Sequence, residues 1–376
     1  MEYMSLAADE LHFVFQNEGE TWDRVCRDRA DLDLRRMCKS VDFVQFYRKS
    51  PWRTAVSFRP GMQVNRKSRD FASCVIRRIS EIQPDLVVIN HLKNAWLIKK
   101  LPISIADRIV FVAHNDEVQM SQSMAQGYES RTMRFAHMLD TWKVRIAQQF
   151  VVKNSIGIVF INDRDARSMT RSLAQHGQVI VIPPRVQSAS PPVQLTDKKA
   201  HALICGSFVW SPKLQNLVDF LDSYSNSTAI TEFDLRVVGM MTDHDLESLR
   251  KRYPTVDIVG PVASTKSYFR EAAISLIPER IGAGTKIKSL ESISYCCLIV
   301  GLNGCLTVPH LQKNSHYYEC ENYSEMIDQV VRSLADVDRC FEKAELAKDV
   351  VEKTLSREKL AGKMSDYLMA VEKKEG

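Results

Sequence analysis

The stretch Ile277-Pro278-Glu279-Arg280-Ile281-Gly282-Ala283-Gly284-Thr285-Lys286-Ile287-Lys288-Ser289-Leu290-Glu291, followed by Cys297-Leu298-Ile299-Val300, decides the fold that we expect. It has the order of a buried strand, a glycine-rich turn, the start of a helix and a second buried strand. Glycine lets the backbone approach a ligand closely. The helix that follows presents unpaired amide groups and the positive end of its dipole to that ligand. The stretch therefore predicts an anion site.

The charged side chains of this stretch indicate what the anion is. Lys286 and Lys288 add positive charge beside the turn, and Glu291, about two turns into the helix, is placed to accept hydrogen bonds from hydroxyl groups. A ligand with phosphates at one end and a polyol at the other satisfies both features, and nucleotide sugars have that shape. A turn of this kind also occurs simply because strand-to-helix turns need glycine, so the surrounding segments have to decide.

Length and composition place the chain among globular proteins of two domains. It has 376 residues, of which 45% are hydrophobic and 26% charged. No apolar run approaches the roughly 20 residues that a membrane-spanning helix needs, and Met1-Glu2-Tyr3-Met4 lacks the order of a secretion signal, so we expect a cytoplasmic protein. The nine cysteines form no Cys-x-x-Cys pair, and we expect no metal and no cofactor.

Charge is uneven along the chain. Residues 1–195 carry 28 basic against 20 acidic side chains, whereas residues 196–376 carry 23 against 26. The basic half is suited to anionic lipid, nucleic acid or a phosphorylated acceptor. A solvated helix face is the alternative, because acidic residues interleave the first basic stretch. The two basic stretches contain Arg24, Arg27, Arg29, Arg35, Arg36 and Lys39, and Arg66, Lys67, Arg69, Arg77 and Arg78.

Strands and helices alternate along both halves. Near-continuous apolar runs indicate strands of a parallel sheet covered on both faces, with amphipathic segments between them. A polar segment with two prolines, 188–196, is the predicted linker. We expect two doubly wound α/β domains, at 1–187 and 197–355, and a C-terminal helix at 356–376 that packs back towards the first domain. The expected strands are 11–15, 84–90, 108–115, 156–161, 179–184, 201–205, 234–238, 257–259, 273–278 and 297–300.

The order of these pieces resembles the GT-B fold of the large retaining glycosyltransferase family four, in which two Rossmann-like domains face a cleft. No single motif is specific, but several occur in register over most of the chain. The motifs that carry the resemblance are Ala113-His114-Asn115-Asp116-Glu117, Phe160 to Asp165, Ile182-Pro183-Pro184-Arg185-Val186, Cys205 to Pro212, Val259-Gly260-Pro261-Val262 with Tyr268, and Pro278 to Glu291.

The resemblance implies a nucleotide-diphosphate sugar as donor, held mainly by the C-terminal domain and used without a metal. Glu291 would bind the ribose hydroxyls, and His114 would contact the donor sugar across the cleft. Gly260 and Val262 would contact the base through main-chain groups. The diphosphate would be held by Gly282, Gly284, Thr285 and Lys286 at the helix start and by the turn at Gly206 and Ser207, with Lys213 and Arg280 as further phosphate partners.

The resemblance also implies an acceptor and a location. The acceptor would be a glycan, a lipid-linked glycan or another cell-envelope molecule, and the basic N-terminal domain would make peripheral contact with the anionic inner face of a membrane. Two departures bear on activity: Ala283 stands where many members have a glutamate, and no clear counterpart of the first strand with its Gly-Gly loop precedes 11–15. A non-catalytic GT-B protein that binds a nucleotide sugar or a partner therefore stays open as an alternative, as does a 2-epimerase. A nucleic-acid partner is not expected.

Overall fold

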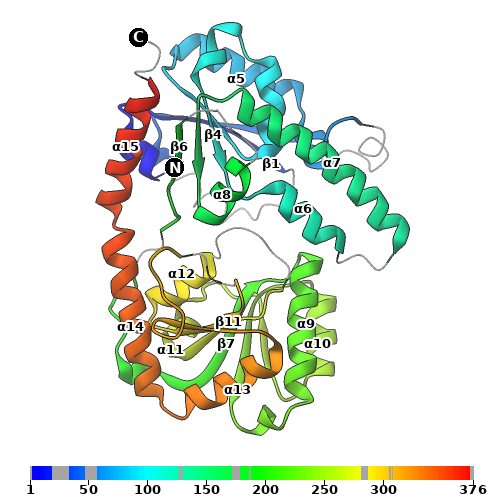
Figure 1. The fold of residues 1–376 in the computed structure, drawn as a ribbon, viewed down its shortest axis with the longest axis vertical. Coiled ribbons are helices and arrows are strands. Elements are labelled where there is room, and N and C mark those ends of the chain that lie inside the picture. The colour runs from blue at the N-terminus through cyan, green and yellow to red at the C-terminus, as the bar shows by residue number, and fades with distance from the viewer. Residues whose placement is uncertain are drawn as a thin grey trace. The chain divides into compact units, whose positions relative to one another are not determined.

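The computed structural model describes residues 2–18, 34–46, 57–126, 130–171, 178–185, 188–280, 287–304, 306 and 308–372. The chain divides into two compact units (Figure 1). Unit 1 is Met1–Ile182 together with Arg357–Gly376, and unit 2 is Pro183–Ser356. In the described part of the chain, no helix combines the length and the apolarity needed to cross a membrane.

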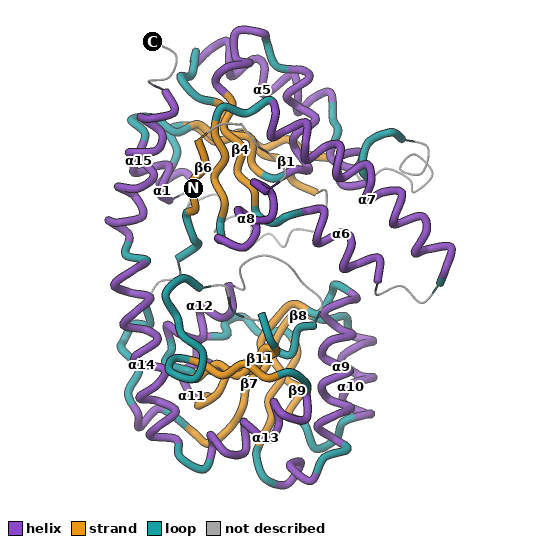
Figure 2. The backbone as a smooth tube through the Cα atoms, in the orientation of Figure 1, coloured by secondary structure: helices purple, strands orange, loops and turns teal. Residues whose placement is uncertain are grey.

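Unit 1 is built on parallel strands with helices on the outside (Figure 2). Every residue of β4 and of β5 is buried, which explains their continuous apolar sequences. The four-stranded sheet has the order β3 (Val87–Asn90), β4 (Ile109–Ala113), β5 (Gly157–Phe160) and β6 (Gln178–Val181), and β1 (His12–Glu18) pairs separately with β2 (Ser40–Phe46). The helices are α1 (Glu2–Ala7), α4 (Gly61–Arg66), α5 (Arg69–Ile82), α6 (Glu117–Gln126), α7 (Arg131–Lys153), α8 (Asp163–Arg171) and α15 (Arg357–Glu372), with 3-10 helices at Leu92–Lys100 and Ile103–Arg108.

The C-terminal helix α15 packs on the sheet of unit 1. The Tyr367 hydroxyl donates a hydrogen bond of 2.9 Å to the carbonyl of Gln178, and Lys363 Nζ donates one of 3.0 Å to the carbonyl of Val181. A Cβ atom at Gly157 in β5 would collide with the Tyr367 hydroxyl. Glycine at this position therefore lets the helix lie close to the strand.

The described residues of unit 2 include a six-stranded sheet whose strands are parallel. The sheet has the order β12 (Tyr317–Cys320), β11 (Leu298–Leu302), β10 (Ala272–Ile277), β7 (Lys199–Ser207), β8 (Asp234–Met240) and β9 (Asp257–Gly260). β10 and β11 are buried along their whole length and form the centre of the core. The helices are α9 (Ser211–Ser225), α10 (Asp243–Arg252), α11 (Lys266–Glu271), α12 (Ile287–Ser294), α13 (Tyr323–Leu334) and α14 (Val337–Thr354), with short 3-10 turns at Leu195–Asp197 and Thr228–Thr231.

The segment expected as a linker packs against unit 2. Ala189 and Val193 are buried in its second apolar cluster, and the Arg270 guanidinium donates to the carbonyls of Pro191 and Pro192 and to the carboxylate of Asp197. Residues 188–196 therefore form an ordered edge of unit 2.

Two strands went unrecognised in the sequence, β2 and β12, and both lie at sheet edges. Most of their residues are half-buried or exposed, so their sequences lack the apolar run that marks a central parallel strand. Residues Leu92–Lys100, within which the sequence indicates a helix at 93–100, form a 3-10 helix.

Candidate functional site

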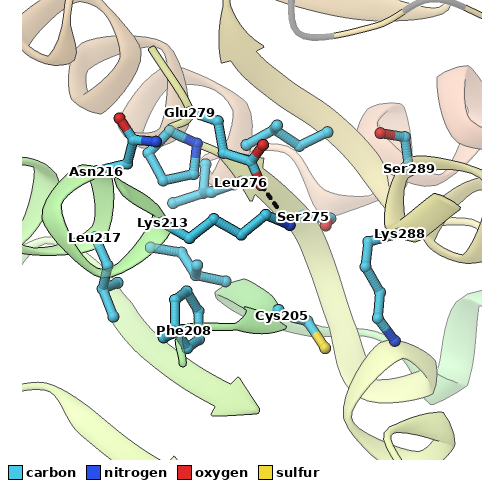
Figure 3. A pocket seen from close by; sticks show the side chains of 14 residues that line it. Cys205, Phe208, Lys213, Asn216, Leu217, Ser275, Leu276, Glu279, Lys288 and Ser289 are labelled. Carbon is cyan, nitrogen blue, oxygen red and sulfur yellow. Dashed lines mark ion pairs between the residues drawn. The ribbon is translucent and has the colours of Figure 1, made fainter. Parts of the chain in front are cut away.

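A pocket opens in unit 2 where β7 and β10 end and α9 and α12 begin (Figure 3). Gly206 lines it from the end of β7, Lys213 from the first turn of α9, and Lys288 and Ser289 from the first turn of α12. In parallel α/β sheets, ligands bind outside the carboxyl ends of the strands, beside helix amino termini that attract anions. The pocket therefore has the position of an anion site in such a sheet, and Gly206 and Lys213, which were predicted to hold the diphosphate, line it.

The backbone at the end of β7 is held by a pair of glycines. Gly206 faces Gly239 of β8 in the strand register, and Gly239 has φ of 148°. A Cβ atom at Gly239 would lie 1.7 Å from the carbonyl oxygen of Gly206, so no larger residue fits without moving the strand end. Gly206 was predicted from the sequence as a site residue and Gly239 was not, although a glycine that directly follows Leu235 to Val238 is the expected signal of such a strand end.

Lys213 makes an ion pair inside the pocket. Its Nζ lies 3.6 Å from Glu279 Oε1, and Figure 3 marks this pair by a dashed line. Glu279 is the residue after Pro278 at the end of β10, and the sequence analysis gave it no role. The Lys213 cation, predicted as a phosphate partner, therefore carries a carboxylate partner here.

Arg280 follows the pocket residue Glu279 and is held by its neighbours. Its main-chain amide donates 3.2 Å to Asn216 Oδ1, and its guanidinium lies 4.0 Å from the centroid of the Tyr323 ring. The Tyr323 hydroxyl donates 3.0 Å to the carbonyl of Pro278, so it secures the chain just before the glycine-rich stretch. Burial raises the pKa of Tyr323 to about 12, which keeps that hydroxyl a donor.

Ser289 is a pocket residue whose hydroxyl makes no hydrogen bond in the described part of the chain. Its side chain is wholly buried, and its hydroxyl has no hydrogen-bond partner there although it lines the pocket. A buried hydroxyl without a partner costs free energy, so native structures seldom keep one without a function or a ligand. Sequence reasoning passed over this residue because serine in a helix is ordinary.

Glu291 lies next to the loop that was predicted to hold the base. Its Oε1 accepts a 3.0 Å hydrogen bond from Thr265 Oγ1, and its Oε2 accepts one of 2.6 Å from Lys288 Nζ. Thr265 follows β9 and directly precedes α11, in the same loop as Gly260 and Val262. Gly260 has φ of 86°, a conformation that favours glycine. Glu291, whose carboxylate was predicted to bind the ribose, is therefore hydrogen-bonded to the loop that was predicted to hold the base.

His114 belongs to a stacked pair in unit 1. Its ring stacks on that of His91, with centroids 3.6 Å apart, and its Nε2 lies 2.7 Å from Asn90 Oδ1. The pKa of His114 is lowered to about 4, first by burial and then by the Lys93 cation, and the pKa of His91 is lowered to about 3 by burial, by His114 and by Lys93. Burial also raises the pKa of Glu117. His91 has φ of 68°, which is unusual for a non-glycine residue.

Several predicted site residues lie outside the described part of the chain, namely Gly282, Gly284, Thr285 and Lys286, together with Ala283. Among the described ones, Ser207 is exposed at the end of β7. The structure brings Gly206, Lys213 and Lys288 to one pocket, and it brings Glu291 to the loop that follows Gly260. Arg280 follows the pocket residue Glu279 and does not itself line the pocket. His114 lies in unit 1.

Comparison with known proteins identifies the fold. No protein-family model matches the sequence, and no curated protein matches it. Among solved structures, the chain is similar to HepE of Anabaena in complex with UDP and glucose, with a TM-score of 0.65 and 10% identity over 96% of this chain and 100% of that one. It is also similar to sucrose-phosphate synthase of Thermosynechococcus elongatus, with a TM-score of 0.63 and 12% identity over 95% and 98% of the two chains.

A third similar structure is TarM, with a TM-score of 0.59 and 10% identity; the match covers 81% of this chain and spans 60% of the length of TarM. The solved structures similar to this chain include GT-B glycosyltransferases, and the predicted GT-B fold is confirmed. Identities this low establish the fold and leave the activity to be argued from the site.

Proposed function

We propose that this protein is a retaining glycosyltransferase that moves a sugar from a nucleotide-diphosphate sugar to a glycan, a lipid-linked glycan or another cell-envelope acceptor. The observation that carries the proposal is the pocket of unit 2, which is lined by Lys288 and by Ser289 with its buried hydroxyl, both from the start of α12. Breaking a sugar–phosphate bond leaves developing negative charge on the diphosphate. Cations, hydroxyls and amides aimed at that charge lower the barrier.

In this proposal each part of the donor has its own partners. The diphosphate takes the hydrogen bond that Ser289 lacks, and it also meets Lys213, Arg280 and Lys286. Glu291 exchanges its bond with Lys288 for the ribose hydroxyls, while the loop of Gly260 and Val262 holds the base. His114 contacts the donor sugar as a neutral imidazole, since its pKa of about 4 keeps it uncharged near neutral pH.

The finer parts of the proposal concern the metal and the location. Lysine and a helix terminus together supply positive charge at the leaving group, so we propose that turnover needs no metal and resists EDTA. We also propose a cytoplasmic protein in peripheral contact with anionic membrane, where a lipid-linked acceptor would be found.

The second candidate is a GT-B protein that binds a nucleotide sugar or a partner without turnover. The ion pair between Glu279 and Lys213 favours it, because a carboxylate in the pocket neutralises a cation that the leaving diphosphate would use and repels the diphosphate itself.

Ligand binding tests the donor site first. Thermal-shift assays with UDP, GDP, ADP and CDP and their diphosphosugars should reveal stabilisation by one nucleotide, of about 2.7 kcal/mol at a ligand concentration of 100 Kd. Glu291→Ala and Lys286→Ala should abolish it. Glu271→Ala is the matched control, because Glu271 pairs with Lys199 on the same unit without lining the pocket. If no nucleotide stabilises the wild type, the proposal is wrong.

Turnover then separates the two candidates. Hydrolysis or transfer of the bound sugar, followed by NMR of the anomeric proton of the product, supports the enzyme and reports retention or inversion. Tight nucleotide binding without hydrolysis or transfer to any acceptor supports the non-catalytic protein. In that case, Glu279→Gln tests whether the carboxylate is what blocks the reaction.

A further inference from the structure

A stripe of large apolar side chains is exposed along helix α7 of unit 1. Its members are between 46% and 63% exposed. They recur at intervals of three, one, three and four residues, so at 100° per residue they fall within an arc of about 100° on one face of the helix. The apolar stripe consists of Phe135, Met138, Leu139, Trp142 and Ile146.

The apolar stripe is not the face by which α7 joins the core. Val144, Ala147 and Val151 are buried in the core cluster of unit 1, and Thr141 Oγ1 lies 2.7 Å from Ser121 Oγ of α6. By the same helical spacing these residues occupy the opposite side of α7. The helix therefore has two apolar faces, and only one of them has a partner within the described chain.

The charges around the apolar stripe are nearly all positive. α7 contains five lysines and arginines and a single acidic residue, Asp140. Asp140 accepts a 3.0 Å hydrogen bond from the Gly61 amide, on the side away from the stripe. The helical spacing places Arg134 and Arg145 along one border of the stripe and Lys143 along the other. The apolar face is thus bordered by cations on both sides.

The 3-10 helix Leu92–Lys100 adds a further cation. Its Lys99 Nζ lies 4.6 Å from the centroid of the Phe150 ring near the end of α7.

We propose that α7 is a docking surface for an anionic lipid bilayer, with the apolar stripe buried at the boundary between headgroups and acyl chains and the bordering arginines and lysines paired with lipid phosphates. An exposed helix face with tryptophan, phenylalanine and leucine on one side and basic residues around them is the pattern of a helix that lies in a membrane interface. The inference rests on the proposed function only for its purpose, which is to bring the transferase to a lipid-linked acceptor.

A second copy of the chain is a poorer occupant. A symmetric dimer through α7 would place the same surface on itself, so the cations bordering one stripe would face those bordering the other. An anionic bilayer satisfies the apolar and the basic residues together. Nucleic acid would satisfy only the basic ones.

Vesicle flotation tests the inference without any donor. The wild-type protein should bind vesicles of phosphatidylcholine and phosphatidylglycerol at 70:30, bind pure phosphatidylcholine more weakly, and lose part of its binding at high salt. The triple variant Phe135→Ser, Leu139→Ser and Trp142→Ser should bind at least about tenfold more weakly, as should Lys143→Glu with Arg145→Glu. The matched control is Leu346→Ser with Met369→Ser, which removes comparably exposed apolar residues elsewhere and should leave binding unchanged.

Spectroscopy and oligomeric state complete the test. Trp142 should give a blue-shifted emission on vesicle binding that disappears in Trp142→Phe. Circular dichroism and the nucleotide thermal shift should stay as in the wild type, which keeps a failure of docking distinct from a failure of the donor site. The inference is overturned if the wild type does not bind anionic vesicles or if the triple variant binds them as well as the wild type does. It is also overturned if the wild type is a dimer in solution and the only effect of the triple variant is to make it a monomer.

Discussion

Replacing Ser289 by alanine should make the free protein more stable and the complex with nucleotide weaker. The Ser289 hydroxyl is wholly buried, lines the pocket of unit 2 and has no hydrogen-bond partner in the described chain. Burying a hydroxyl without a hydrogen-bond partner costs about 1–3 kcal/mol of desolvation free energy, and Ser→Ala removes that hydroxyl with almost no change in side-chain volume. After allowing for lost packing, we expect a gain of about 1 kcal/mol, or about 1 °C in Tm for a chain of 376 residues that unfolds as a whole.

The effect on binding should have the opposite sign. A hydrogen bond from a hydroxyl to a charged phosphate contributes about 1.5–3 kcal/mol, and 1.4 kcal/mol corresponds to a tenfold change in Kd. Isothermal titration with the nucleoside diphosphate that the wild type prefers should therefore give a Kd raised at least about tenfold in Ser289→Ala. Opposite changes in the two measurements distinguish a ligand-binding group from a structural one.

Ser292 provides the matched control on the same helix. Its hydroxyl is also buried, but it lies 2.8 Å from Ser275 Oγ and 2.7 Å from the carbonyl of Lys288. Ser292→Ala should therefore lower stability by about 1 kcal/mol and leave the nucleotide Kd within about threefold. The reasoning fails if Ser289→Ala destabilises the free protein, or if it binds nucleotide as tightly as the wild type does.

Three further predictions concern the frame around the sites. Gly239→Ala should destabilise the protein by about 3 kcal/mol or more, because its Cβ would overlap the carbonyl of Gly206. Gly362→Ala in α15 is the control, and it should be neutral or slightly stabilising because the space around Gly362 is open. The urea midpoints of the two variants test this. Gly157→Ala should lower the free energy of unfolding, because the new Cβ would collide with the Tyr367 hydroxyl of α15. Tyr367→Phe removes that hydroxyl, so it should restore part of the lost stability in the double variant. Additive changes in the free energy of unfolding across this mutant cycle would contradict the assigned collision. The free energy of unfolding should fall as pH drops from about 6.5 towards 4, because both histidines bind protons in the unfolded chain but stay neutral in the folded one, where the pKa of His114 is about 4 and that of His91 about 3. The double variant His91→Leu with His114→Leu should reduce this pH dependence in urea titrations. An unchanged pH dependence would refute the assignment.

Local sequence was enough to predict the repeated strand-and-helix order. β4, β5, β10 and β11 are buried along their lengths, and a strand covered on both faces must be apolar at every position, which leaves an unmistakable run. β2 and β12 escaped because an edge strand has fewer buried positions. The fold prediction was correct without these two strands, because the central strands define the architecture.

The sequence by itself determined which residues stand at strand ends and helix starts, among them Gly206, His114 and Lys288, because backbone preference and apolar periodicity act over a few neighbouring residues. Only the tertiary structure decided what meets them: Glu279 beside Lys213, His91 on His114, Thr265 on Glu291, and Gly239 against Gly206. Those partners come from other strands and loops, or from the far side of a turn, so no local pattern encodes them. The same reason explains why a commonplace serine became informative only once the packing showed its hydroxyl buried without a partner in the described chain.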